Sequence, residues 1–278
     1  MSLTTSTLRR SPIALSRPAN LPHPERAVSR GDAVRVRRGV YADAAEWRAL
    51  APWDRYLAEV HAVAMTRPDA VFSHESAAVL SGLPVFGRPE FVHVLDEPYA
   101  RARGSAGVRT HTTHGERRLM ELGGLILTAP CETAVDIARS RHPAAALAVA
   151  DAALRADPLL TVDTLRGCNE SRISSRGRAR AREPLAGADG AAESPLESVS
   201  RAAIGWLGFA KPMLQVSFPD GSGSEDRCDF WWPGVGVVGE SDGDIKLDQA
   251  VLGDGDTHGD RARGPDPGGP TTPLEPPG

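Results

Sequence analysis

The segment "CDFWWPGVGVVGESDG", residues 228–243, constrains the fold most, because it predicts a hairpin bracketed by acidic residues. Two apolar runs flank a Pro-Gly-Val-Gly turn signal, and a two-residue turn there sets Trp231 opposite Val238. The same register sets Asp229 opposite Glu240. Directly opposed residues have Cβ atoms roughly 4.5–5.5 Å apart, so like charges there are destabilising unless they are compensated. We interpret this pair as a cation site.

Further acidic and basic residues follow the hairpin. Asp242 lies two residues after Glu240 and therefore on the same strand face. Three carboxylates in one patch suit a hard divalent ion such as Mg²⁺ or Mn²⁺, which can polarise a phosphodiester. Lys246 is a candidate for stabilising a developing anion, or else a solvated side chain. In the alternative interpretation, a different register separates the acids and "ESDGD" is an acidic turn.

A helix is predicted directly before the hairpin. Ser194 is placed to cap it, Pro195 occupies its first turn, and Glu197 completes a capping-box pattern. Gly208 is the predicted stop. Strands are then expected at 213–218, 227–232 and 236–242, so this part reads as one helix followed by antiparallel strands.

The middle of the chain, from about 45 to 170, alternates between helical and strand patterns, and the predicted fold class is α+β. Helices are expected at 52–67, after Ser73, after Thr128, at 143–157 and near 161–170, with strands at 90–96 and 108–114. The strand histidines His93, His111 and His114 have no acidic partner at ligand-like spacing. We therefore expect exposed histidines there rather than a metal site.

Arginines gather in two segments. Residues 28–43 alternate apolar and basic side chains, which predicts a strand whose Arg35 and Arg37, followed by Arg38, form either a DNA-contacting wing or a solvated face. Residues 171–194 have little to bury and are interpreted as a linker. A second set of candidate DNA contacts lies in this segment, although solvated arginines are the commoner case in a linker. These candidates are Arg176, Arg178 and Arg180.

Composition excludes some classes of protein. A formal charge of −4 argues against a uniformly basic nucleic-acid binder. The sequence contains neither a long uncharged apolar run nor an export-signal core, so we expect a cytoplasmic protein without a membrane span. Cys131, Cys168 and Cys228 are widely spaced, which supports neither a disulfide framework nor a zinc site.

The motifs "SPLES", "RCDFWWP" and "VGVVGESDGDIK" resemble the very-short-patch-repair-like endonuclease domain of actinobacterial proteins, a branch of the PD-(D/E)xK nuclease fold. The resemblance implies that Asp229, Glu240 and Glu197 hold a metal ion. The lysine usual two places after the Glu is Asp242 here, which leaves Lys246 as the candidate catalytic cation.

Upstream, "VRVRRGVYAD", "FSHESAAVLSGLP", "FVHVLDEP" and "ILTAPCETAVDIAR" are similar to the body of AbiEi-type antitoxins of type IV toxin–antitoxin systems. This resemblance implies an N-terminal winged helix, here a remnant, that binds DNA, with a toxin protein as a possible partner. The expected function is therefore a DNA-associated, metal-dependent endonuclease-like protein. The alternative is a non-enzymatic transcriptional regulator or antitoxin.

These patterns predict five regions, with the oligomeric state left open. The nuclease-like domain is expected to be cut short, with weak or absent activity, because the residues after it are rich in Pro and Gly. The regions are a mobile N-terminus (1–27), an antitoxin-like region (28–170), a linker (171–194), a truncated endonuclease-like domain (195–247) and a disordered tail (248–278).

Overall fold

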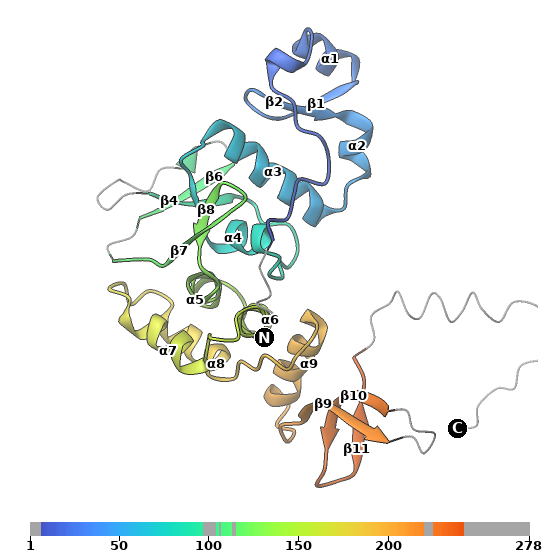
Figure 1. The fold of residues 1–278 in the computed structure, drawn as a ribbon, viewed down its shortest axis with the longest axis vertical. Helices are drawn as coiled ribbons and strands as arrows, with labels where there is room; N and C mark the ends of the chain where they lie inside the picture. Colours follow the sequence, from blue (N-terminus) through green and yellow to red (C-terminus); the bar gives the residue numbers. More distant parts are fainter. Residues whose placement is uncertain (1–6, 97–103, 106, 113–114, 220–224, 242–278) are drawn as a thin grey trace, which may run out of the picture. The chain divides into compact units, whose positions relative to one another are not determined.

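The computed structural model describes residues 7–96, 104–105, 107–112, 115–219 and 225–241. Helices and mixed or antiparallel sheets make up this part of the chain, which confirms the predicted α+β class (Figure 1). No helix within these ranges is long and apolar enough to cross a membrane. The predicted tail at 248–278 lies outside the described residues.

The N-terminal part is a small helix–hairpin–helix unit. Its elements are the 3-10 helix η1 (Pro18–Asn20), α1 (Pro24–Arg30), β1 (Ala33–Arg37), β2 (Val40–Asp43) and α2 (Ala44–Ala49). Residues 28–43 were expected to form one strand, but the chain reverses at Gly39, whose φ of 79° suits glycine. The mobility of residues 1–27 stays a prediction; in the part that the structure describes, from residue 7 onward, the Arg9 N–H donates to the Leu80 carbonyl (2.9 Å).

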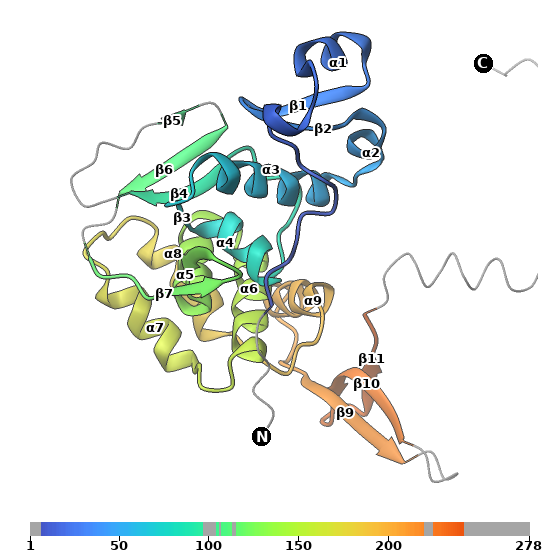
Figure 2. The same ribbon diagram turned by 45° about the horizontal axis from the view of Figure 1, so that its top comes forward.

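A mixed sheet lies at the centre, and its described strands run in the order β5-β6-β4-β3-β8-β7 (Figure 2). These are β3 (Val71–Phe72), β4 (Val92–Asp96), β5 (Gly104–Ser105), β6 (Val108–Thr112), β7 (Leu119–Leu122) and β8 (Leu125–Thr128). Helices α3 (Pro52–Thr66) and α4 (His74–Ser81) pack against it. Tyr56, Phe72, Val108 and Leu127 are fully buried between these layers.

A second core joins five helices: α5 (Pro130–Ser140), α6 (Pro143–Ala156), α7 (Val162–Ser171), α8 (Arg178–Ala186) and α9 (Pro195–Trp206). Prolines begin α5, α6 and α9, where the missing N–H has no intrahelical partner to lose. Alanine dominates this core. Small side chains allow the helix backbones to approach one another closely.

The linker interpretation of residues 171–194 is wrong, because this segment contains α8. Ala181 and Leu185 of α8 are fully buried, and the helix packs against α5, α6 and α7. The two residues stand four apart, which places them on one helix face. The many arginines of this segment made it look like a solvated linker, although it contains a short amphipathic helix.

Gly177, which precedes α8, has no room for a side chain. Its φ is 72°, and a Cβ added there would lie 2.2 Å from the carbonyl oxygen of Arg139. We expect Gly177→Ala to lower the free energy of unfolding by about 2–4 kcal/mol in chemical denaturation. Gly167→Ala is the matched control, because Gly167 lies inside α7 with open space around it and alanine should stabilise by about 0.5–1 kcal/mol. Equal effects of the two substitutions would contradict this account.

The last described sheet follows α9 and is antiparallel, in the order β11-β10-β9. Its strands are β9 (Met213–Pro219), β10 (Glu225–Trp232) and β11 (Val237–Gly239). Cys228 and Phe230 are its buried side chains, whereas Val237 and Val238 are exposed.

The expectation of exposed strand histidines is also wrong. His93 is 4% exposed and His111 is partly buried, and both imidazoles stack with His74 at the start of α4. His114 lies outside the described residues. The cluster could not be predicted from spacing along the sequence, because its three histidines come from three different elements.

Candidate functional site

The hairpin register predicted from the sequence is confirmed. Trp232 pairs with Val237 and Trp231 with Val238, although the turn spans four residues, 233–236, rather than two. The described ladder ends at the pair Phe230↔Gly239. Asp229 on β10 and Glu240, which follows β11, are the next residues beyond it.

Gln215 is a member of this site that the sequence did not reveal. The β9–β10 pairs Cys228↔Val216 and Phe230↔Leu214 bracket it, so Gln215 lies opposite Asp229. Its φ of 53° is unusual for a residue other than glycine. The regular pairing of β9 with β10 is interrupted at this residue. The irregularity directs its amide towards the carboxylates, since Gln215 Nε2 donates to Asp229 Oδ1 at 3.2 Å.

Glu197 reaches the same amide from α9. The capping box is present in part: the Glu197 N–H donates to Ser194 Oγ at 3.1 Å, as predicted. The Glu197 carboxylate, however, accepts from the N–H of Glu193 (3.0 Å) and from Gln215 Nε2 (2.8 Å). Glu197 is 4% exposed, so its carboxylate is held in place by packing as well as by hydrogen bonds.

One amide nitrogen thus bridges two carboxylates, and we name Glu197, Gln215, Asp229 and Glu240 the acid cluster. Asp229 Oδ2 also accepts from the Ser241 N–H at 2.8 Å. The partial positive charge of the amide lies where two anionic groups converge. Carboxylate oxygens are ligands that Mg²⁺ and Mn²⁺ prefer, whereas the Gln215 amide presents its nitrogen to both carboxylates.

The remaining predicted site residues are not part of this arrangement. Glu240 is exposed at the end of the sheet. Asp242 and Lys246 lie outside the described residues. The structure therefore brings Glu197 and Asp229 together through Gln215. Glu240 is the next residue beyond the last β10–β11 pair, and no contact joins it to the other two carboxylates among the described residues.

The candidate DNA-binding arginines differ in exposure. Arg35, Arg38, Arg176 and Arg180 are exposed. Burial lowers the pKa of Arg37, as does the nearby charge of Arg67. Arg178 is half-buried and donates to the backbone carbonyls of Arg172 and Ser174. Arg37 is half-buried, and Arg178 is engaged with the backbone, so these two are poorer candidates for phosphate contact than the exposed arginines.

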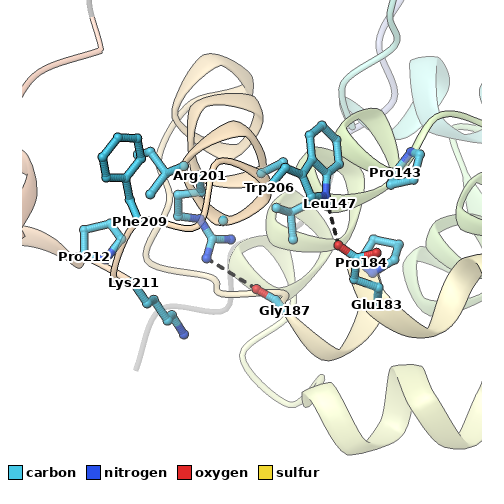
Figure 3. A pocket seen from close by; sticks show the side chains of 13 residues that line it. Pro143, Leu147, Glu183, Pro184, Gly187, Arg201, Trp206, Phe209, Lys211 and Pro212 are labelled. Atoms are coloured by element: carbon cyan, nitrogen blue, oxygen red, sulfur yellow. Dashed lines mark hydrogen bonds between the residues drawn. The ribbon is translucent and has the colours of Figure 1, made fainter.

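A cavity of about 320 Å³ opens between α6, α8 and α9 (Figure 3). Trp206 and Phe209 line its apolar side, and Trp206 Nε1 donates to Glu183 Oε1 at 2.9 Å. Lys211 lies at its edge. None of the acid-cluster residues lines this cavity, so it does not extend the candidate site.

Comparison with known proteins adds relatives without an assigned activity. No family model matches the chain. Two uncharacterized proteins from two strains of Mycobacterium tuberculosis are each 38% identical to it over 149 residues, which is 54% of this chain and 54% of each relative. The chain therefore spans about half the length of the curated relatives it matches.

Proposed function

We propose that the chain is a DNA-associated protein whose acid cluster is a divalent-metal-dependent, endonuclease-like site. The observation that supports this is that Glu197 and Asp229, from different elements, both accept a hydrogen bond from the one amide nitrogen of Gln215, so the two carboxylates lie close together. The likeness of the surrounding motifs to PD-(D/E)xK nucleases supports DNA as the substrate. On this proposal the protein acts in the cytoplasm.

Glu197 and Asp229, with Glu240, would hold Mg²⁺ or Mn²⁺, and the bound ion would supply polarisation of the phosphodiester and hydroxide near neutral pH. The chain's own contribution is orientation. The N–H groups of Glu193 and Ser241 each fix one carboxylate. Gln215 spans both, and rotation of its amide would present its carbonyl oxygen instead of its N–H group.

A plasmid assay tests the proposal. Purified full-length chain is incubated with supercoiled DNA in Mg²⁺, in Mn²⁺ or with EDTA, and the nicked and linear forms are quantified. Nicking in either metal and none in EDTA would support the proposal. DNA left intact in both metals, under conditions where the protein binds it, would contradict the enzymatic part and favour the regulator.

The β1–β2 hairpin is our candidate for the DNA-contacting surface, and it serves either function. Arg35 and Arg38 are exposed on it, and Arg35 makes only a 4.0 Å ion pair with the exposed Glu25. An exposed guanidinium with so loose a partner can move to a phosphate at little cost. A toxin partner, as the antitoxin resemblance implies, is not needed for this contact.

We expect the double substitution Arg35→Ala and Arg38→Ala to weaken DNA binding at low salt and to reduce the slope of log K against log salt concentration by about 1–2. The reason is that each lost phosphate contact releases about one counterion fewer. Fluorescence anisotropy across a salt series measures both quantities. Arg30→Ala is the control, because Arg30 is already paired with Asp32 at 2.8 Å; an equal loss in that variant would argue against a specific hairpin surface.

A further inference from the structure

A cluster of three imidazoles lies apart from the acid cluster, on α4 and the central sheet. His74 begins α4, His93 lies on β4 and His111 on β6. Strands β4 and β6 pair in parallel, with Arg109 opposite His93, so His111 is the diagonal neighbour of His93 on the same face. The three rings stack, with centroids 4.0–5.2 Å apart.

The ring nitrogens converge. His93 Nδ1 lies 2.7 Å from His111 Nε2, and one nitrogen from each of the three rings falls within 4.8 Å of the others. Tetrahedral zinc with Zn–N distances near 2.0–2.1 Å separates its nitrogen ligands by roughly 3.3 Å. The nitrogens are thus near the separation that a shared ion needs, and coordination would require the rings to tilt out of their stack, because an imidazole lone pair lies in the ring plane.

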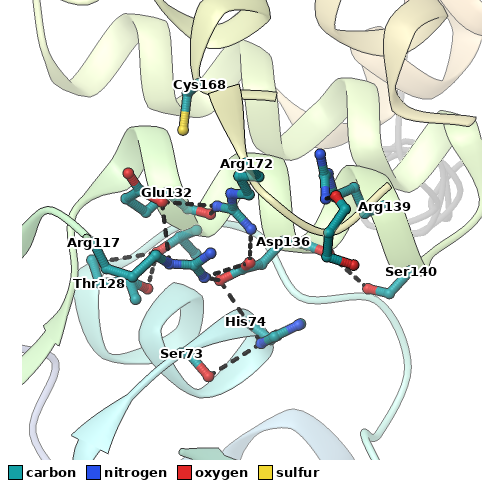
Figure 4. Close-up of polar contacts among 12 residues, drawn as sticks. Ser73, His74, Arg117, Thr128, Glu132, Asp136, Arg139, Ser140, Cys168 and Arg172 are labelled. Atoms are coloured by element: carbon teal, nitrogen blue, oxygen red, sulfur yellow. Dashed lines mark hydrogen bonds and ion pairs between the residues drawn. The ribbon is translucent and has the colours of Figure 1, made fainter. Parts of the chain in front are cut away.

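Buried carboxylates stand behind two of the rings. His93 Nε2 lies 3.4 Å from Glu75 Oε2. His74 Nδ1 lies 3.8 Å from Asp136 Oδ2, and Figure 4 shows these two side chains facing each other. Metal-bound histidines usually direct their other nitrogen at a carboxylate, which fixes the tautomer and makes the ligand more basic. The nitrogen of His93 that faces away from Glu75 is Nδ1, which is hydrogen-bonded to His111 Nε2, so a bound ion would replace that hydrogen bond.

The two carboxylates are not equivalent. Asp136 is compensated by Arg117 and Arg172, both of which hydrogen-bond to it. Glu75 Oε1 accepts from Arg141, but the buried Glu75 Oε2 accepts no hydrogen bond from the described residues. A buried carboxylate oxygen without a donor is costly, and a metal-bound His93 would give it a polarised N–H to accept.

His74 has a φ of 49°, a conformation uncommon outside glycine that concentrates at functional sites.

We propose that His74, His93 and His111 form a binding site for a borderline transition-metal ion of the Zn²⁺ class, oriented by Glu75 and distinct from the acid cluster. Neutral imidazole suits Zn²⁺, Co²⁺ and Ni²⁺ better than the hard Mg²⁺ ion. Three protein ligands leave a fourth position for water or a ligand from outside.

The test is titration of chelator-treated full-length protein with Zn²⁺ against a chromophoric competitor, with Co²⁺ absorption reporting tetrahedral coordination. We expect one ion per chain, with affinity reduced at least about 100-fold in His111→Gln and about 10–100-fold in Glu75→Gln. His61→Gln is the matched control, because His61 lies on α3, where its Nε2 contacts the Arg9 carbonyl instead (2.8 Å). Asp229→Asn should likewise retain Zn²⁺.

If a variant loses the circular dichroism spectrum of the folded protein, a measurement on the wild type takes its place. This measurement is the rise in the wild-type Tm on adding Zn²⁺. A shift with Zn²⁺ but not with Mg²⁺ supports the site. Absence of Zn²⁺ binding by the wild type, or binding that survives His111→Gln in a folded variant, would overturn the proposal and leave a hydrogen-bonded histidine stack.

Discussion

Arg201→Ala should lower the free energy of unfolding by about 3–5 kcal/mol, because it leaves a buried carboxylate without its cation. Arg201 on α9 donates to Asp151 Oδ2 on α6 at 2.6 Å, and the side chains of the pair are 5% and 0% exposed. Burial raises the pKa of Asp151 even with Arg201 opposing that shift. Removing the arginine therefore leaves Asp151 either charged without compensation or protonated.

Chemical denaturation followed by circular dichroism measures this effect. Arg182→Ala is the matched control, because its bidentate pair with Glu170 is exposed to solvent. The denaturation midpoint of this control should stay at the wild-type value. If Arg201→Ala also leaves it unchanged, the ion pair does not join α9 to the helical core as we infer.

Asp229→Ala should reduce the weak metal-dependent nicking proposed for the wild type to the background level seen in EDTA, a loss of at least about 10-fold. The substitution removes the carboxylate that accepts from both the Gln215 amide and the Ser241 N–H. On the proposed function, this also removes a metal ligand. The initial nicking rate in Mn²⁺ is the quantity to compare.

Asp226→Ala separates this role from a general loss of negative charge. Asp226 lies on the same strand, three residues earlier, and is exposed. Its nicking rate should match the wild type, and both variants should retain the wild-type circular dichroism spectrum, which shows that each is folded. Equal rates in Asp229→Ala and Asp226→Ala would show that Asp229 takes no part in cleavage.

Local patterns in the sequence predicted much of the C-terminal part of the fold. Alternation around a single strong turn signal fixes the β10–β11 register, since a slip by one residue would move every side chain to the other face. Ser194, Pro195 and Gly208 mark the two ends of α9 because capping is a local interaction. Glu197 and Asp229 could therefore be named in advance.

Gln215 could not be predicted in the same way. Its left-handed φ is imposed by the sheet around it, and no glycine or asparagine marks the position. The histidine cluster was missed because a parallel strand pair and a helix start bring it together. Helix α8 had a usable signal, the apolar pair Ala181 and Leu185 four residues apart, but the surrounding arginines outweighed it.

Electron paramagnetic resonance of Mn²⁺ tests the central claim most directly, because a protein-bound ion loses the six-line signal of the free ion. We predict one Mn²⁺ per chain in the wild type, lost in Asp229→Asn and Glu197→Gln and retained in His111→Gln and Asp226→Asn. Retention of the same bound fraction in Asp229→Asn and Glu197→Gln would contradict the account, because the acid cluster would then not be the site that holds the ion.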